Sequence, residues 1–145
     1  MNWITRSHVH VDRVACPWLI KRFIDSEAKF LFVPKSQLLA TAEREGAISF
    51  DSPGARYHHD GDLCTFSVLI REYSLTDKAL LRMAKVVNAA DTGRLEQDPL
   101  ASGLEALAVG YGLRYPDDAV NLEKQFELYD ALYAWCRLET AKDNG

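Results

Sequence analysis

All four histidines of this chain fall in two short segments that also carry carboxylates. The first segment is His8-Val9-His10-Val11-Asp12, and the second is His58-His59-Asp60-Gly61-Asp62. Imidazole nitrogens and carboxylate oxygens are the ligands that suit zinc, iron or manganese. These residue types therefore indicate a site for one divalent transition metal ion. The alternative is that both segments are polar strand ends.

If both segments are extended, the backbone determines which side chains share a face. Because side chains alternate between the faces of a strand, His8, His10 and Asp12 would share one face. Adjacent His58 and His59 would face opposite ways, so one of them is expected to be a ligand and the other a supporting or structural residue. Spacing alone favours an exposed polar face. The presence of every histidine in just two segments is what favours a metal-binding site.

Both segments lie where a strand is expected to pass into a helix. If the two strands are neighbours in the sheet, their ends would bring histidines and aspartates together in a crevice. Asp91 is expected at the end of a helix, where a carboxylate opposes the helix dipole, and a ligand role would explain it. The predicted metal ligands are therefore His10, Asp12, His58, His59 and Asp91.

Two arginines and one cysteine near these segments could carry further chemistry. Arg13 opens the helix expected after the first segment and Arg22 closes it. Arginine forks and free helix amides suit a tetrahedral oxyanion, although surface solubility is the simpler interpretation. Cys64 would lie in the first turn of a helix, which lowers the pKa of a thiol and makes a reactive thiolate conceivable. The neighbouring aspartates act in the opposite direction.

Hydrophobic periodicity predicts a small sheet followed by helices. Extended segments are expected at 3–11, 30–33 and 47–51, and a type II turn at 52–55 would return the chain along 56–59 as a hairpin arm. A helix is expected over 12–25, or only from residue 16 because of Pro17, and another over 36–45. Three more helices would follow: one capped by Asp62, one capped by Thr76, and one ended by Gly110 and Gly112.

The last helix is the clearest, because its apolar residues alternate spacings of four and three: Leu122, Phe126, Tyr129, Tyr133 and Cys136. Together these elements predict an α+β fold, with a small N-terminal β-sheet of three or four strands packed with about five helices.

Composition is that of one globular unit. The 145 residues are 48% hydrophobic and 26% charged, which is enough for a single core. A net charge of −4 without a basic stripe makes direct nucleic-acid binding an unfavoured interpretation. The chain has no apolar stretch of the ~20 residues that span a bilayer. It has no visible signal peptide, and its three cysteines are widely spaced, so a cytoplasmic protein without disulfides is expected.

The run from residue 11 to residue 25, VDRVACPWLIKRFID, resembles the DRxAxxWLIxRFID signature of the ChrB C-terminal domain, the chromate-resistance protein family. The segments 30–34, 58–66 and 89–91 resemble it too, so the resemblance covers nearly the whole chain. It implies one ChrB C-terminal-like domain over residues 1–145. The winged-helix-like region of longer members has no counterpart, so no separate DNA-binding domain is expected. The matching positions of interest are Asp12, Arg13, Trp18, Arg22, His58, Asp62 and Asp91. This motif position favours His58 over His59 as the metal ligand.

Two functions follow from these residues. The first is a chromate-resistance-associated domain that binds a metal ion, a small tetrahedral oxyanion or both, as a sensor or accessory without turnover. The second is a small mononuclear metalloenzyme, with zinc, iron or manganese held by His and Asp ligands, acting on an oxyanion or small molecule. A closed four-ligand site favours the first and an exchangeable water favours the second. The sequence leaves open whether the protein turns over a substrate and whether it forms a homodimer.

Overall fold

Three parallel strands form one small sheet in the computed structural model, which describes residues 1–143. The strands are β1 (Asn2–Arg6), β2 (Lys29–Val33) and β3 (Ile48–Ser49), in the order β2-β1-β3. Trp3 of β1 pairs with Phe30 on one side and with Ile48 on the other. The expected hairpin arm at 56–59 is wrong, since only an isolated bridge joins Phe50 to Tyr57, and that bridge is parallel.

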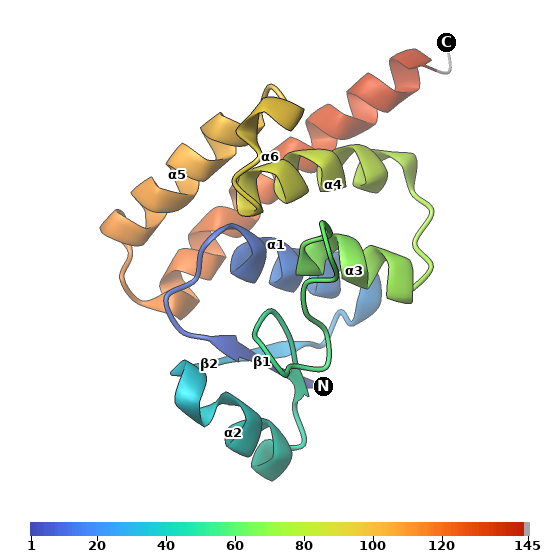
Figure 1. Cartoon of the computed structure of the whole chain (residues 1–145). Helices are drawn as coiled ribbons and strands as arrows, with labels where there is room; N and C mark the ends of the chain where they lie inside the picture. The colour runs from blue at the N-terminus through green and yellow to red at the C-terminus, as the bar shows by residue number, and fades with distance from the viewer. Residues whose placement is uncertain (144–145) are drawn as a thin grey trace.

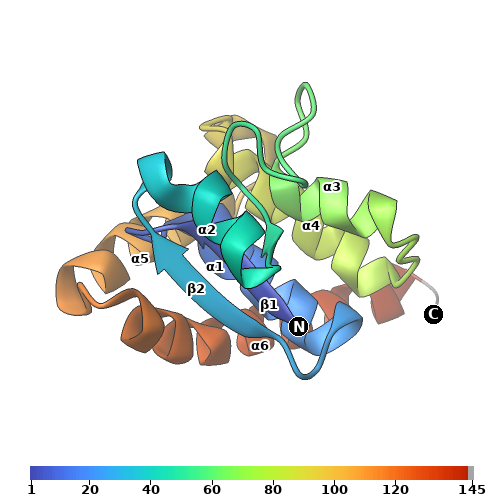
Figure 2. The ribbon, with the colours of Figure 1, turned by 90° about the horizontal axis from the view of Figure 1, so that it is seen from below.

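Two helices cross between the strands on opposite faces of the sheet. Helix α1 (Val11–Leu19) leads from β1 towards β2, and α2 (Leu38–Glu45) leads from β2 to β3. Figures 1 and 2 show α1 on one face and α2 on the other. The strand order therefore reverses at β1, and the carboxyl ends of β1 and β3 flank this switch point. Parallel sheets covered by helices on both faces bind their ligands at such points.

The remaining helices stack on the α1 side of the sheet (Figure 1). They are α3 (Thr65–Glu72), α4 (Lys78–Asp91), α5 (Ala101–Arg114) and α6 (Asp118–Asp143). With three strands and six α-helices within residues 1–143, the predicted α+β fold is confirmed. None of the helices in that range has both the length and the apolar character that crossing a bilayer requires.

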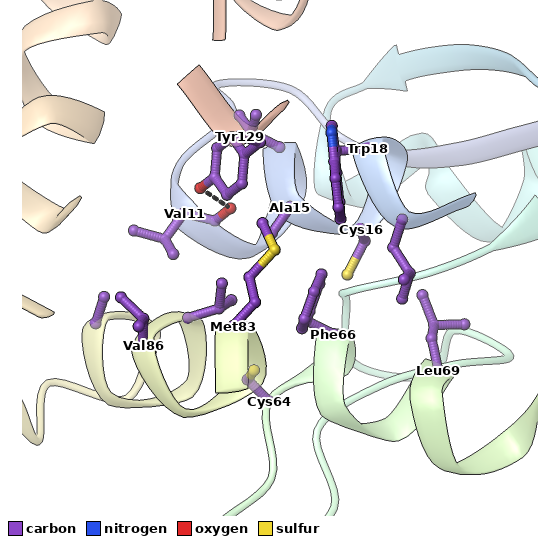
Figure 3. Packing of buried hydrophobic residues seen from close by; sticks show 14 of the residues in the cluster. Val11, Ala15, Cys16, Trp18, Cys64, Phe66, Leu69, Met83, Val86 and Tyr129 are labelled. Atoms are coloured by element: carbon purple, nitrogen blue, oxygen red, sulfur yellow. Dashed lines mark hydrogen bonds between the residues drawn. The ribbon is translucent and has the colours of Figure 1, made fainter. Parts of the chain in front are cut away.

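The core lies where α1 packs against α3, α4 and α6 (Figure 3). The predicted stripe of α6 faces this core: Leu122, Tyr129 and Cys136 are buried, and Phe126 and Tyr133 pack partly buried against it. The Tyr129 hydroxyl donates a hydrogen bond of 3.3 Å to the Val11 carbonyl oxygen, which ties α6 to the start of α1.

The segment from residue 7 to residue 10 is not the extended strand that the alternation predicts. β1 ends at Arg6, and His8 adopts a left-handed backbone with φ 64°. The amides of His8 and Val9 donate to the Asp118 carboxylate at 3.0 and 2.9 Å, and this contact from the start of α6 accompanies the turn of the chain. Helix α1 then begins at Val11 and passes through Pro17, so the later start considered for this helix is wrong.

Two other helix ends differ from expectation. Helix α5 continues through Gly110 and Gly112 to Arg114, because glycine lowers helix propensity without preventing a helix. Helix α4 is capped by Asp77 rather than Thr76, with Asp77 Oδ1 accepting from two amides of its first turn. Gly46 ends α2 in the left-handed conformation that the sequence predicts for it.

Two glycine substitutions should change stability in opposite directions. At Gly46, φ is +61° and an added Cβ would meet nothing within 4 Å, so Gly46→Ala should destabilise by ~1–2 kcal/mol through the backbone alone. Gly110 lies inside α5 with similarly open surroundings, so Gly110→Ala should stabilise by ~0.5–1 kcal/mol. Urea unfolding measures both changes, and shifts of the same sign would contradict the assigned conformations.

A candidate metal centre

Three carboxylates and one imidazole converge at the carboxyl ends of β1 and β3. The Asp–His cluster consists of Asp12 in the first turn of α1, Asp51 just after β3, His59 in the loop before α3, and Asp91 at the end of α4. His59 Nε2 lies 3.4 Å from Asp12 Oδ2, 3.3 Å from Asp51 Oδ1 and 3.1 Å from Asp91 Oδ2. One nitrogen therefore meets oxygens from three separate elements.

Asp12 also holds the start of α3. Its side chain is buried, Oδ2 accepts from the Thr65 amide at 2.7 Å, and Oδ1 accepts from the Phe66 amide at 3.1 Å. The first amides of a helix have no partner within it, so a carboxylate there satisfies them and complements the helix dipole. Asp12 thus performs, from 53 residues away, the task of an N-terminal cap.

The expectation that Asp62 caps this helix is wrong. The residue at the N-cap position is Cys64, and it makes no side-chain cap hydrogen bond. Asp62 points to solvent and pairs with Arg94. Its lower pKa follows from that hydrogen bond and charge.

Hydrogen bonds and burial shift the pKa values of the cluster in opposite directions. Burial, and then the charge of Asp51, raise the pKa of Asp12 to about 7, and they raise that of Asp91 as well. Burial also acts to raise the pKa of Asp51, but hydrogen bonds from His59 and Thr65 outweigh it and hold that pKa below its usual range. Hydrogen bonds to Asp12 and Asp51 raise the pKa of His59 to about 10.

At neutral pH, His59 therefore carries a proton among the three acidic side chains, of which Asp12 is only partly ionised. Buried like charges are costly unless an opposite charge lies among them. A divalent cation would supply more of that charge than the single proton does. The arrangement is chemically suited to exchanging the proton for a metal ion.

Two overlapping sets of potential ligands exist among the described residues. The outer set is Asp12, Asp51 and His59, and the inner set is Asp12, Cys64 and Asp91. Within each set, one ligand atom per residue lies within 4.8 Å of the others. Most of these potential ligands are carboxylates or imidazole, which suit zinc, iron and manganese better than soft monovalent ions.

A cavity of about 340 Å³ adjoins the cluster. It is lined by Arg6, Asp51, Ser52, Pro53, His58 and His59. Arg13 borders the cluster as well: Nη1 lies 3.8 Å from Asp51 Oδ2, Nη2 donates to the His8 carbonyl, and Nε is buried without a hydrogen-bond partner among the described residues. The cavity gives a small ligand access to Asp51 and His59 of the cluster, beside the Arg6 side chain.

The structure brings together three of the five predicted metal ligands, Asp12, His59 and Asp91. His10 is the N-cap residue of α1 and is in neither ligand set. His58 lines the cavity, and its Nδ1 lies 2.8 Å from the His59 carbonyl oxygen. The structure thus places His59, rather than the favoured His58, among the carboxylates.

The two predicted oxyanion ligands separate. Arg13 lies beside the cluster, whereas Arg22 is engaged elsewhere: its Nε and Nη2 donate to the two Asp130 oxygens at 3.0 Å each, and its guanidinium lies over the Phe126 ring. Burial, and then the Asp12 carboxylate, raise the pKa of Cys64 above its usual value. This direction is the reverse of the lowered pKa that its position at a helix start predicts.

Asp51 is the residue that sequence reasoning missed. It ends the segment 47–51, which is predicted as a strand, and the segment after β1 supplies Asp12. The carboxyl ends of neighbouring parallel strands meet at one edge of a sheet, so a parallel pairing of these strands would have brought Asp51 into the site. The hairpin interpretation pairs segment 47–51 with residues 56–59 instead, so it does not predict Asp51 as a site residue.

The fold and the cluster define a small α+β protein with an Asp–His cluster at the carboxyl ends of its parallel strands. The chain belongs to the ChrB C-terminal domain family, which matches residues 3–136. It is similar to Protein ChrB of Cupriavidus metallidurans, with 39% identity over 133 residues, and it spans 40% of the length of that relative. The resemblance to the chromate-resistance family is confirmed. No solved structure matches the chain.

Proposed function

We propose that this chromate-resistance-type domain binds one divalent transition metal ion, zinc, iron or manganese, at the Asp–His cluster, as a sensor or accessory domain. The observation that carries the proposal is the position of His59 Nε2, 3.1–3.4 Å from oxygens of three carboxylates. A proton on this nitrogen is the charge that a metal ion would replace. Imidazole with carboxylates is a common donor set for these three metals.

Asp12 can bind a metal ion without giving up its hold on α3. Each carboxylate oxygen has two lone pairs, and one on each accepts from the amides of Thr65 and Phe66. The hydrogen bonds fix the carboxylate in place, as hydrogen bonds to metal ligands usually do. The site is thus oriented by the backbone before an ion arrives.

A small oxyanion is a second candidate ligand, and Arg13 favours it. Its Nε is buried without a partner among the described residues, and Arg6 lines the adjoining cavity. Three carboxylates would repel an anion, so we expect oxyanion binding to require the metal. A ligand at an open metal position is also what the alternative, a small mononuclear metalloenzyme, would need. Arg22 is excluded from this role by its pairing with Asp130.

Elemental analysis of the protein purified without an affinity tag tests the proposal. We expect about one ion per chain after zinc, iron or manganese is supplied in turn. Asp91→Asn should lower both content and affinity, whereas Asp60→Asn, the same change at an exposed residue next to His59, should not. A wild-type protein that holds none of the three metals would refute it.

Metal affinity should depend on pH over an unusually wide range. Since the pKa of His59 is raised to about 10, the metal must displace a proton throughout the neutral range. Affinity should therefore rise by at least about tenfold per pH unit from about pH 6 to 8, and more steeply below pH 7, where Asp12, whose pKa is raised to about 7, must also lose its proton. A histidine with an ordinary pKa of ~6.5 would instead give an affinity that levels off above about pH 7.5. Competition with a chelator of known pH dependence distinguishes the two.

A further inference from the structure

We infer that Cys64 is a further ligand of this metal ion, so that the site selects zinc over manganese and magnesium. The inference rests on the metal binding proposed above and names the class of ion. Thiolate sulfur is a soft donor that suits zinc, whereas magnesium and manganese prefer oxygen. A site built from His, Asp and Cys would therefore differ in selectivity from one built from His and Asp alone.

The geometry of the inner set carries the inference. Ligand atoms of Asp12, Cys64 and Asp91 lie within 4.8 Å of one another, and two of these carboxylates are also within 3.4 Å of His59 Nε2. His59 and Cys64 thus both approach the same pair of carboxylates. The inner set and His59 together would supply four donors, the number that a tetrahedral zinc site uses.

The sulfur is buried and held in position. Cys64 is fully buried, and its amide donates to Asn88 Oδ1 at 2.7 Å. Asn88 lies one turn before Asp91 on α4, and its Nδ2 also donates to the Asp62 carbonyl at 3.0 Å. The turn of α4 that presents Asp91 therefore also fixes the residue that presents the sulfur. Figure 3 shows the Cys64 side chain beside α4.

The other two cysteines do not share this position. Cys16 Sγ donates to Asp12 Oδ1 at 3.6 Å and belongs to neither ligand set, and Cys136 is a core residue of α6. The Cys64 thiol contacts Ser67, whose Oγ lies 3.9 Å from Sγ, and the sulfur keeps a lone pair for a metal ion. A dication between Asp12 and Asp91 would neutralise the charges that disfavour a thiolate, and binding would release the thiol proton to solvent.

Cobalt provides the test, because a thiolate bound to Co²⁺ gives charge-transfer absorption in the near ultraviolet. Titration of the wild-type chain with Co²⁺ should produce this absorption and saturate at about one ion per chain. Cys64→Ser should abolish it, and Cys136→Ser should retain it as the matched control. Zn²⁺ should displace the Co²⁺, and Mn²⁺ at the same concentration should not. The affinity for Zn²⁺ should fall by about tenfold or more in Cys64→Ser.

The possible failures are distinguishable. Stoichiometric Co²⁺ binding by the wild type without the charge-transfer absorption, or with an absorption that survives in Cys64→Ser, overturns the role of Cys64 and leaves the metal site standing. Absence of any Co²⁺, Zn²⁺ or Mn²⁺ binding overturns the metal site and this inference with it. The wild-type titration alone tests whether a thiolate binds the metal ion, even if Cys64→Ser fails to fold.

Discussion

Replacing Asp12 with alanine should destabilise the metal-free protein by about 3–5 kcal/mol. Asp12 is 1% exposed, and its removal would leave the amides of Thr65 and Phe66 buried without acceptors and would deprive His59 of an anionic partner. Breaking a buried, hydrogen-bonded charge cluster costs several kcal/mol, because the groups left behind stay desolvated. Denaturant unfolding in the presence of a chelator measures the loss.

The control is Asp62→Ala, which removes the carboxylate that local sequence rules place at the same helix start. Asp62 is exposed and paired with Arg94, so this change should cost far less than Asp12→Ala. Asp12→Asn keeps one oxygen acceptor and should fall between the two. Equal losses for Asp12→Ala and Asp62→Ala would show that Asp12 does not hold α3.

Replacing His59 with alanine should weaken metal binding by about 100-fold or more. Its Nε2 lies within 3.4 Å of an oxygen of each of the three carboxylates, and loss of even an orienting partner of a ligand costs about 10–100-fold. Isothermal titration with Zn²⁺ gives the affinity, and circular dichroism verifies that the variant is folded.

His58→Ala is the matched control, one residue away. His58 lies outside both ligand sets, so its loss should change the affinity by less than about threefold, well under the cost of losing a partner of a ligand. If His58→Ala abolished binding and His59→Ala preserved it, the ligand assignment would be reversed. If both retained full affinity, neither imidazole would be a ligand.

Clustering of residue types predicts most of the candidate site, whereas local geometry misassigns parts of it. The concentration of histidines and aspartates in two segments indicates Asp12 and His59, and the unfavourable helix end indicates Asp91, before the fold is known. The strand rule that turns His58 and His59 to opposite faces fails because the chain around residue 58 is an irregular loop, and the motif position that favours His58 does not show which imidazole reaches the carboxylates. The alternation over 8–12 fails because Asp118, far along the chain, binds the amides at residues 8 and 9.

The elements of the fold are predictable, but their pairing is not. Apolar periodicity identifies α6 and the strands, because each buries one face or stripe. Whether β3 pairs with β1 or β2 depends on which faces α1 and α2 cover, and that depends on contacts between distant residues. The cap of α3 shows the same limit, since a rule restricted to neighbours selects Asp62 and cannot find a carboxylate 53 residues earlier.

The long separations between the residues of the Asp–His cluster also bear on how the chain folds. Asp12 contacts Thr65 across 53 residues, and its amide contacts Asp91 across 79. Closing such loops costs entropy before the contact is gained, and chains with distant contacts fold more slowly than chains with local ones. The three aspartates can meet only after the sheet, α3 and α4 have come together. A nascent chain would therefore reach residue 91 before it could first assemble the whole cluster.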